Sequence, residues 1–253
     1  MSKIDNLYLQ TLKHQLIDLH RCIGYEHKSL INVGPFHLTR AKKLDKEARV
    51  LGEDWPAYAE SMIGLKRMDN IQYLVGEIIK NNVPGDLLEA GVWRGGASIF
   101  MKANLIVHQS DKQLYVCDSF EGLPRPTHIE DKGDVHYKQK YLQASRGNVA
   151  FNFEKYGLLD QGIHFIKGWF KDTMPKLKDR QFSLLRLDGD MFQSTWDVIS
   201  NLYPCLAPGG YIIIDDYRLN GCRVAVHKYR LLNDIRDPII KIDRIAAYWQ
   251  KTS

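Results

Sequence analysis

From residue 61 onward, segments with helical periodicity alternate regularly with short apolar segments of strand length. The helical pattern at 68–81 is followed by a strand pattern at 86–92 and then by a second helical pattern at 95–107. Strands that alternate with helices pair in parallel, because each helix returns the chain to the edge where the previous strand began. The sequence therefore predicts an α/β fold in which helices flank a mostly parallel sheet.

The alternation continues to the end of the chain and places acidic residues at strand ends. Three expected strands finish on a carboxylate, at Asp118, Asp188 and Asp215. Open parallel sheets bind their ligands at the carboxyl ends of the strands, so we expect the functional site along this edge. The remaining expected elements are strands at 113–118, 163–168, 182–188 and 209–215, helices near 138–156, 170–177, 194–206 and 221–235, and a late antiparallel strand pair near 239–240 and 246–251.

The charge and composition of the 253-residue chain argue against several classes of protein. A net charge of +5 is small for a nucleic-acid-binding surface, and the densest basic segment, 40–49, is interleaved with acidic residues. No window approaches the roughly 18 consecutive apolar residues of a membrane helix, and residues 1–15 lack the apolar core of a signal peptide. The four cysteines form no CxxC pair. We expect a cytoplasmic protein that binds neither nucleic acid nor membranes.

Residues 1–60 have a different pattern from the rest of the chain. Leucines between residues 7 and 19 recur at helical spacing, and a second helix is expected near 39–51. We divide the chain into a helical N-terminal extension, 1–60, and a main domain, 61–253. Because the extension is too apolar to be fully solvated, we expect it to serve as a lid over the site or as a contact in a homo-oligomer. Its large apolar residues include Leu30, Ile31, Phe36 and Trp55.

The loop after the first expected strand has the glycines of a tight ligand-binding turn. Its spacing is G-x-x-x-G-G, which differs from the G-x-G-x-x-G of dinucleotide-binding folds. The acidic Glu89 would repel a pyrophosphate, so a ligand with an amino group, such as S-adenosylmethionine, suits the loop better. A strand-to-helix turn without a ligand is the alternative. The candidate donor-binding residues here are Glu89, Gly91, Trp93, Arg94, Gly95 and Gly96.

Two further loops at the same edge are candidates for the rest of the donor site. Asp118 ends the second expected strand, where a carboxylate can accept hydrogen bonds from both hydroxyls of a ribose. Ser119 follows it directly. Gly168, Trp169 and Phe170 follow the third expected strand, where an adenine ring can lie against apolar surface. Helix capping by Asp118 and core packing by the aromatic pair are the alternative interpretations.

Four carboxylates lie in the segments LDGDM and IIDDY, at the ends of two strands. Carboxylates gathered at one place repel each other unless a cation or a proton relieves the repulsion. A divalent ion that prefers oxygen ligands, most simply Mg²⁺, would do so while leaving positions open for a substrate. The alternative is helix capping together with salt bridges to Arg186 and Arg218. The four carboxylates are Asp188, Asp190, Asp215 and Asp216.

Taken together, the loops EAGVWRGGAS, DSFEGLP, GWFKDTMP, LDGDM and IIDDY resemble those of the macrocin O-methyltransferase (TylF) family over residues 56–250. The resemblance implies a Rossmann-like class I methyltransferase fold and an enzyme that depends on S-adenosylmethionine and Mg²⁺. Its implied acceptor is a sugar hydroxyl of a glycosylated natural product or another small saccharide. By the same resemblance, Asp190, Asp215 and Asp216 bind the metal, and Asp190 is also the general base.

Two alternatives to sugar methylation remain open at the level of sequence. An acceptor that is a catechol or another non-sugar vicinal diol would use the same carboxylates and the same methyl donor. A nucleotide-binding or regulatory module could keep the fold without catalysis, since fold alone does not establish function.

Overall fold

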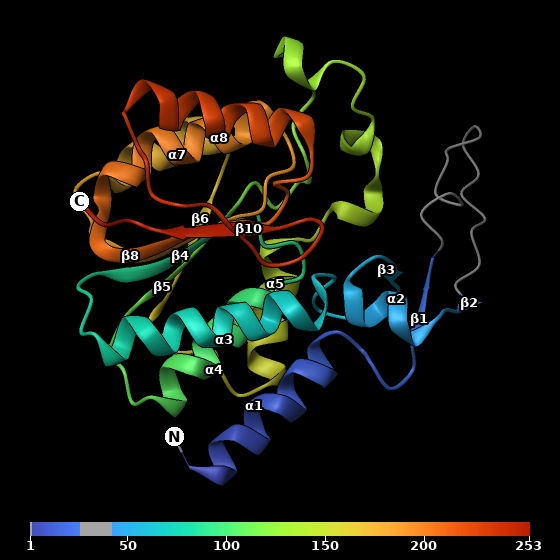
Figure 1. The fold of residues 1–253 in the computed structure, drawn as a ribbon. Coiled ribbons are helices and arrows are strands. Elements are labelled where there is room, and N and C mark those ends of the chain that lie inside the picture. The colour runs from blue at the N-terminus through green and yellow to red at the C-terminus, as the bar shows by residue number, and fades with distance from the viewer. Residues whose placement is uncertain (1, 26–41) are drawn as a thin grey trace.

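A seven-stranded sheet forms the centre of the computed structural model, which describes residues 2–25 and 42–253 (Figure 1). All neighbouring strands pair in parallel except the last two, which run antiparallel to their neighbours. The prediction of a mostly parallel sheet with a late antiparallel pair is therefore confirmed. In spatial order the strands are β6 (Ile163–Lys167), β5 (Leu114–Asp118), β4 (Asp86–Ala90), β7 (Phe182–Leu187), β8 (Leu206–Ile214), β10 (Ala247–Gln250) and β9 (Ile240–Lys241).

Helices cover both faces of this sheet (Figure 1). One face carries α1 (Lys3–Leu16), α3 (Gly64–Lys80), α4 (Gly96–Val107) and α5 (Arg146–Lys155). The other carries α7 (Phe192–Leu202) and α8 (Asn220–Leu232). The short α6 (Phe170–Thr173) follows β6 directly. No helix in residues 2–25 and 42–253 is long and apolar enough to cross a membrane.

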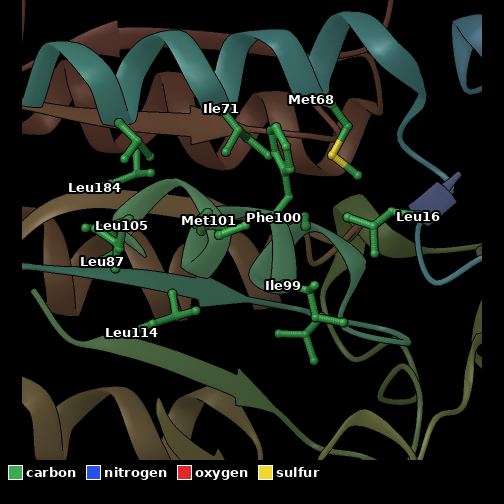
Figure 2. Close-up of a cluster of buried hydrophobic side chains, with 14 of the residues drawn as sticks. Leu16, Met68, Ile71, Leu87, Ile99, Phe100, Met101, Leu105, Leu114 and Leu184 are labelled. Carbon is green, nitrogen blue, oxygen red and sulfur yellow. The ribbon is translucent and has the colours of Figure 1, made fainter. Parts of the chain in front are cut away.

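The central strands are apolar along their whole length because both of their faces are buried. In β4, Leu87 packs with the α3 and α4 side and Leu88 with the α7 and α8 side. The same alternation holds in β5, where Leu114 and Tyr115 belong to opposite clusters. Figure 2 shows the first cluster, in which strand residues meet residues of the helices. Its labelled members include Leu87, Leu114 and Leu184 from the strands, Ile71 from α3 and Phe100 from α4.

The described part of the N-terminal extension contains α1, the short α2 (Lys46–Leu51) and a three-stranded sheet. Arg49 is fully buried there and binds Asp54 as well as the carbonyl oxygens of Ile17 and Ile23. The sheet consists of β2 (Lys42–Lys43), β1 (Ile23–Tyr25) and β3 (Trp55–Pro56), in that order. One buried guanidinium therefore joins the pieces of the extension.

Two helix predictions need correction. The helix expected near 39–51 begins at Lys46, because the Asp45 side chain caps it, and residues 42–43 form a strand instead. Residues 39–41, like Leu30, Ile31 and Phe36, lie outside the described residues. The helix expected near 138–156 begins only at Arg146, because the Ser145 side chain accepts the N–H of Asn148.

The residues between β5 and α5 therefore form a long loop with three short 3₁₀ turns. These turns are Ile129–Asp131, His136–Lys138 and Lys140–Leu142. Asp131 fastens the loop to the other side of the sheet, because its carboxylate accepts the N–H groups of Phe192 and Gln193 at the start of α7. The loop is thus held across the carboxyl edge of the sheet.

Backbone hydrogen bonds continue beyond the ends of the strands and align the loops at this edge. The N–H of Asp188 donates to the carbonyl of Ala90 at 2.8 Å, and the N–H of Asp215 donates to that of Leu187 at 2.8 Å. Gly168 donates to Asp118 in the same way, at 2.9 Å. Acidic residues far apart in the sequence are therefore in register at one edge.

The backbone of Gly91 lies very close to the backbone of Asp188 at this edge. Its φ is +89°, and a Cβ at this position would lie 1.7 Å from the carbonyl oxygen of Asp188. Gly133 has a similar φ, +94°, with no atom within 4 Å of the equivalent position. Replacing each glycine by alanine therefore distinguishes the free-energy cost of a positive φ, which both positions share, from the cost of a steric overlap, which only Gly91 has.

We predict that Gly91→Ala lowers the free energy of unfolding by about 2–5 kcal/mol, because positive φ and overlap act together. Gly133→Ala should cost about 1–2 kcal/mol from its φ alone. Urea denaturation of both variants measures the difference. Equal losses in the two variants would show that the approach of Gly91 to Asp188 does not constrain this edge.

Candidate functional site

A cavity of about 1060 Å³ opens at the carboxyl edge of the sheet. Loops after β4, β5, β6, β7 and β8 line it, together with residues 52–55 and 60–63 of the chain and the long loop after β5. Ligand-binding cavities commonly measure about 300–1000 Å³, so this one has room for a methyl donor and an acceptor together. The position is the one expected for a parallel sheet, beside the point where strand order reverses.

Most of the residues proposed from sequence for donor binding line this cavity. They come from the loops after β4, β5 and β6, which are neighbouring strands. The structure therefore brings together three loops that are separated by up to about eighty residues in the sequence. The lining residues of this group are Glu89, Gly91, Trp93, Asp118, Ser119, Gly168, Trp169 and Phe170.

Arg94, Gly95 and Gly96 do not line the cavity. Arg94 turns toward the N-terminal extension and donates to the carbonyls of Ala57 and Ala59, each at 3.0 Å. Gly96 donates its N–H to the carbonyl of Glu60. A Cβ at Gly95 would lie 2.7 Å from Val149, and one at Gly96 would lie 2.5 Å from Ser61. These glycines allow close packing against protein.

Asp118 holds the turn after β5. Its two carboxylate oxygens accept the N–H groups of Val92 at 2.8 Å and Phe120 at 2.7 Å. Burial raises the pKa of its carboxyl, and these hydrogen bonds partly offset the rise. The hydroxyl of Ser119 lies 3.4 Å from Oδ1 of Asp118, so only part of the acceptor capacity of this carboxylate is open to a ligand. Ser119 is occupied within the turn, where it donates to the carbonyl of Gly122.

Glu89 has protein partners for both of its oxygens. Arg186 and Ser98 each donate a hydrogen bond to it, and its side chain is almost completely buried. Burial raises the pKa of Glu89 to about 7, even though Arg186 opposes the rise. The sequence-based hypothesis that Glu89 faces the donor's ammonium group therefore competes with an ion pair that the structure forms.

Asp188, Asp215 and Asp216 each offer a carboxylate oxygen within 4.8 Å of the others. Asp190, which we expected as the third member of this group, stands beside it. Its φ of +57° turns the chain after Gly189, and its N–H donates to the Oδ2 of Asp216 at 2.9 Å. The structure therefore groups Asp188 with Asp215 and Asp216 and puts Asp190 next to them.

Two buried arginines neutralise part of this acidic cluster. Arg186 from β7 contacts the carboxylates of Asp188 and Asp215 in addition to Glu89. Arg67 from α3 donates to Asp215 at 2.5 Å. The salt-bridge alternative raised by the sequence is therefore correct for Arg186. Arg218 lines the cavity, but no salt bridge of its side chain appears within the described residues.

The two arginines neutralise only part of the negative charge of the cluster, and the pKa values of its carboxyl groups respond to this. Burial works against ionisation of Asp215, but Arg186 and Arg67 outweigh it and lower the pKa of this carboxyl. Burial and the charge of Asp188 raise the pKa of Asp190 to about 7. Burial and the charge of Asp190 raise the pKa of Asp216. Additional positive charge would stabilise the ionised cluster.

The chemistry of the donor atoms suits a hard divalent cation. The cluster offers carboxylate oxygens only, the ligands that Mg²⁺ prefers, and it faces a cavity with room for water and substrate. The side-chain carboxylate of Asp216 accepts just one hydrogen bond from the described residues, from the N–H of Asp190, so most of its acceptor positions are open. The residues present therefore fit a magnesium ion.

Sequence analysis missed two residues of the cavity wall. His136 bonds Asp134 through Nδ1 at 3.1 Å, and this bond raises its pKa, with a further contribution from Asp190. Arg67 lies in α3, and nothing in a helical sequence pattern distinguishes it from a surface arginine. The D-x-H spacing of Asp134 and His136 was the one available signal, and it is too common to be specific.

Comparison with known proteins identifies the family. The model of the family described as Macrocin-O-methyltransferase (TylF) matches residues 7–251. An 8-demethyl-8-(2,3-dimethoxy-alpha-L-rhamnosyl)-tetracenomycin-C 4'-O-methyltransferase from Streptomyces olivaceus is 47% identical over 214 residues, covering 83% of this chain and 82% of that protein. Demethyldecarbamoylnovobiocin O-methyltransferase from Streptomyces niveus is 46% identical over 213 residues, covering 82% and 81%.

A solved structure gives the same answer. The O-methyltransferase NovP superposes with a TM-score of 0.89 at 40% identity, over 98% of this chain and 100% of that chain. The resemblance inferred from the five loop motifs is confirmed. The chain belongs to the macrocin-O-methyltransferase (TylF) family and is an S-adenosylmethionine-dependent O-methyltransferase.

Proposed function

We propose that this enzyme methylates a sugar hydroxyl of a glycosylated natural product or another saccharide, with Mg²⁺ as cofactor and Asp190 as general base. The observation that carries the proposal is the incompletely neutralised cluster of buried carboxylates in the wall of the cavity that the expected donor loops also line. Catechols and other non-sugar vicinal diols are the competing acceptors.

The names of the relatives support a sugar acceptor. The relative from Streptomyces olivaceus is named for 4'-O-methylation of a rhamnosyl tetracenomycin, and one from Micromonospora griseorubida, 44% identical over 215 residues, is a mycinamicin III 3''-O-methyltransferase. A methyl-donor assay with a panel of glycosides and a panel of catechols tests the proposal. Product on the catechol panel alone would favour the competing acceptors.

Asp188, Asp215 and Asp216 would hold the metal, with Asp190 beside them or as a further ligand. A divalent cation there supplies positive charge that stabilises the oxyanion developing on the acceptor. Asp215 already accepts from Arg186 and Arg67, so it contributes through its remaining lone pairs. The two arginines and the cation would then together offset the charge of the acidic cluster.

The reaction itself needs one proton acceptor and good alignment. The acceptor oxygen attacks the sulfonium methyl, the new C–O bond forms as the C–S bond breaks, and the hydroxyl proton passes to the carboxylate of Asp190. A base must be ionised to accept the proton, and a divalent cation nearby would favour the ionised form of Asp190, whose pKa is about 7 in the metal-free protein. Holding the two reactants in line supplies much of the acceleration.

We assign the acceptor side of the cavity to the N-terminal extension. Residues 52–55 of the extension line the cavity, and Trp55 stacks on Tyr141 of the long loop at 4.9 Å between ring centroids. The division into an extension at 1–60 and a main domain at 61–253 is part of this proposal. Assembly into a homo-oligomer also stays a prediction.

The first prediction here concerns the donor. Asp118→Ala should weaken the binding of S-adenosylmethionine by about 1–3 kcal/mol, because hydrogen bonds between ribose and a charged group are lost. Isothermal titration calorimetry measures the affinity. Since Asp118 also caps the turn, Asp86→Ala, which removes a similar backbone-binding carboxylate at the far end of β4, serves as the control. Unchanged affinity would remove Asp118 from the donor site.

The second prediction concerns the metal. Chelation should abolish turnover and Mg²⁺ should restore it, because the carboxylates otherwise lack compensating charge. Asp216→Asn should raise the Mg²⁺ concentration needed for half-maximal rate by about tenfold or more, whereas Asp179→Asn on the exposed surface should not change it. Full turnover in chelator, with elemental analysis showing no bound metal, would disprove the assignment.

The third prediction concerns the base. Asp190→Asn keeps the size of the side chain but removes its basicity, so the rate should fall by about 10² or more. The loss should persist at saturating Mg²⁺, and donor affinity should not change. Turnover close to that of the wild type, measured with the best acceptor, would exclude Asp190 as the base.

Although Asp190→Asn should slow the reaction, it should raise the stability of the metal-free protein at alkaline pH. The pKa of Asp190 is about 7 in the folded protein and about 3.9 in an unfolded chain, so the wild type loses stability as pH rises between these values. Asparagine carries no such charge. In metal-free buffer, Asp190→Asn should therefore melt above the wild type at pH 8 and close to it at pH 4.5. A difference independent of pH would refute this account of Asp190.

A further inference from the structure

A second cavity of about 440 Å³ adjoins the first and is unusually basic. Its wall carries four cationic side chains: Arg218, Arg223, Lys241 and Arg244. Arg218 and Arg244 also line the main cavity, so the two spaces share a rim. The loops that carry these two arginines are joined by a backbone hydrogen bond, from the N–H of Arg218 to the carbonyl of Ile245 at 2.9 Å.

The one carboxylate of this second cavity does not neutralise it. Asp243 turns toward the protein, where its Oδ1 accepts the N–H groups of Ile245 at 2.7 Å and Ala246 at 2.8 Å. Its Oδ2 lies 3.1 Å from the Nε of Arg67. Arg67 shares its one positive charge between Asp243 and Asp215, and the wall of the second cavity holds four cations against one carboxylate.

The cations themselves have few partners. Among the described residues, no hydrogen bond or salt bridge is formed by the side chain of Arg218 or Lys241. Arg223 donates to the neutral amide of Asn220 at 3.3 Å. Arg244 pairs with Glu53 at 2.9 Å, but its side chain is 75% exposed, and ion pairs of exposed side chains contribute little stability. The wall is therefore free to bind an anion.

We propose that the second cavity binds a phosphoryl group carried by the sugar acceptor, an inference that rests on the proposed function. Guanidinium groups match phosphate oxygens in charge and geometry and bind them through paired hydrogen bonds. Several cations facing one small cavity suit a dianionic or more highly charged phosphate better than the single charge of a sugar carboxylate. The acceptor class is thus a phosphorylated saccharide, such as a glycosyl phosphate or diphosphate.

The arrangement of charge also orients such an acceptor. Arg218 follows Asp216 by two residues, so the basic wall begins where the acidic cluster ends. A phosphoryl group would be repelled from the carboxylates and attracted to the arginines. The hydroxyl end of the same molecule is then directed toward Asp190 and Asp216. Opposite charges on adjoining walls would fix which end of the acceptor reaches the methyl donor.

A binding experiment with inorganic pyrophosphate tests the site directly and requires no turnover. Titration calorimetry is carried out in metal-free buffer with S-adenosylhomocysteine present, so that the donor site is filled. We expect saturable binding that Arg218→Gln and Arg244→Gln each weaken by about tenfold, the scale of a lost charged hydrogen bond. Arg236→Gln is the matched control, because Arg236 is exposed and pairs with Asp234 outside both cavities.

Three results of these titrations would overturn the inference. One is the absence of saturable pyrophosphate binding by the wild type, and the second is equal weakening by Arg218→Gln and Arg236→Gln. Glucuronate that binds more tightly than pyrophosphate would also overturn it, because the site would then prefer a carboxylate. Melting temperatures of the three variants within about 2 °C of the wild type show that the surface substitutions leave the fold intact.

A kinetic comparison links the site to the acceptor. We expect kcat/KM for a sugar 1-phosphate to exceed that for the methyl glycoside of the same sugar by about tenfold or more, and Arg218→Gln to remove this preference. Equal values for the two acceptors in the wild type would refute the inference. Failure of every sugar to accept a methyl group would instead refute the proposed function, and the pyrophosphate titration separates the two outcomes.

Discussion

The buried guanidinium of Arg186 is the interaction on which the rest of the site depends. It lies on the central strand β7 and contacts Glu89, Asp188 and Asp215, which belong to three neighbouring strands or the loops after them. Without a cation at this position, three carboxylates would face each other in an interior of low dielectric constant, where unpaired charges are strongly destabilising. Arg186 therefore allows the sheet to carry acidic residues at its carboxyl edge.

Arg67 extends this network from the sheet to the extension and to the second cavity. Its three nitrogens contact Asp215, Asp243 and the carbonyl of Gly52. A single side chain thus joins the acidic cluster, the wall of the basic cavity and residues 52–55, which also line the main cavity.

Carboxylates whose charge is only partly neutralised destabilise the folded protein, and a role in catalysis accounts for their presence. Asp216 is buried and Asp190 is partly buried; both carry raised pKa values and share only one hydrogen bond with each other. Groups of this kind destabilise a fold unless a ligand compensates them, and they occur most often where chemistry is performed. The same physical feature therefore underlies both the cation site and the general base that we propose.

The sequence by itself determined the sheet, the edge that carries the site and the family, because apolar periodicity, strand-end carboxylates and loop motifs are local patterns. Only the tertiary structure decided which charges meet. Gly95 packs against Val149 of α5, and Gly96 packs against Glu60 and Ser61. Asp188, not Asp190, groups with Asp215 and Asp216, and Arg67 and the four basic residues reach their places from distant elements. Such contacts depend on how helices and loops pack in three dimensions, which spacing along a chain does not encode.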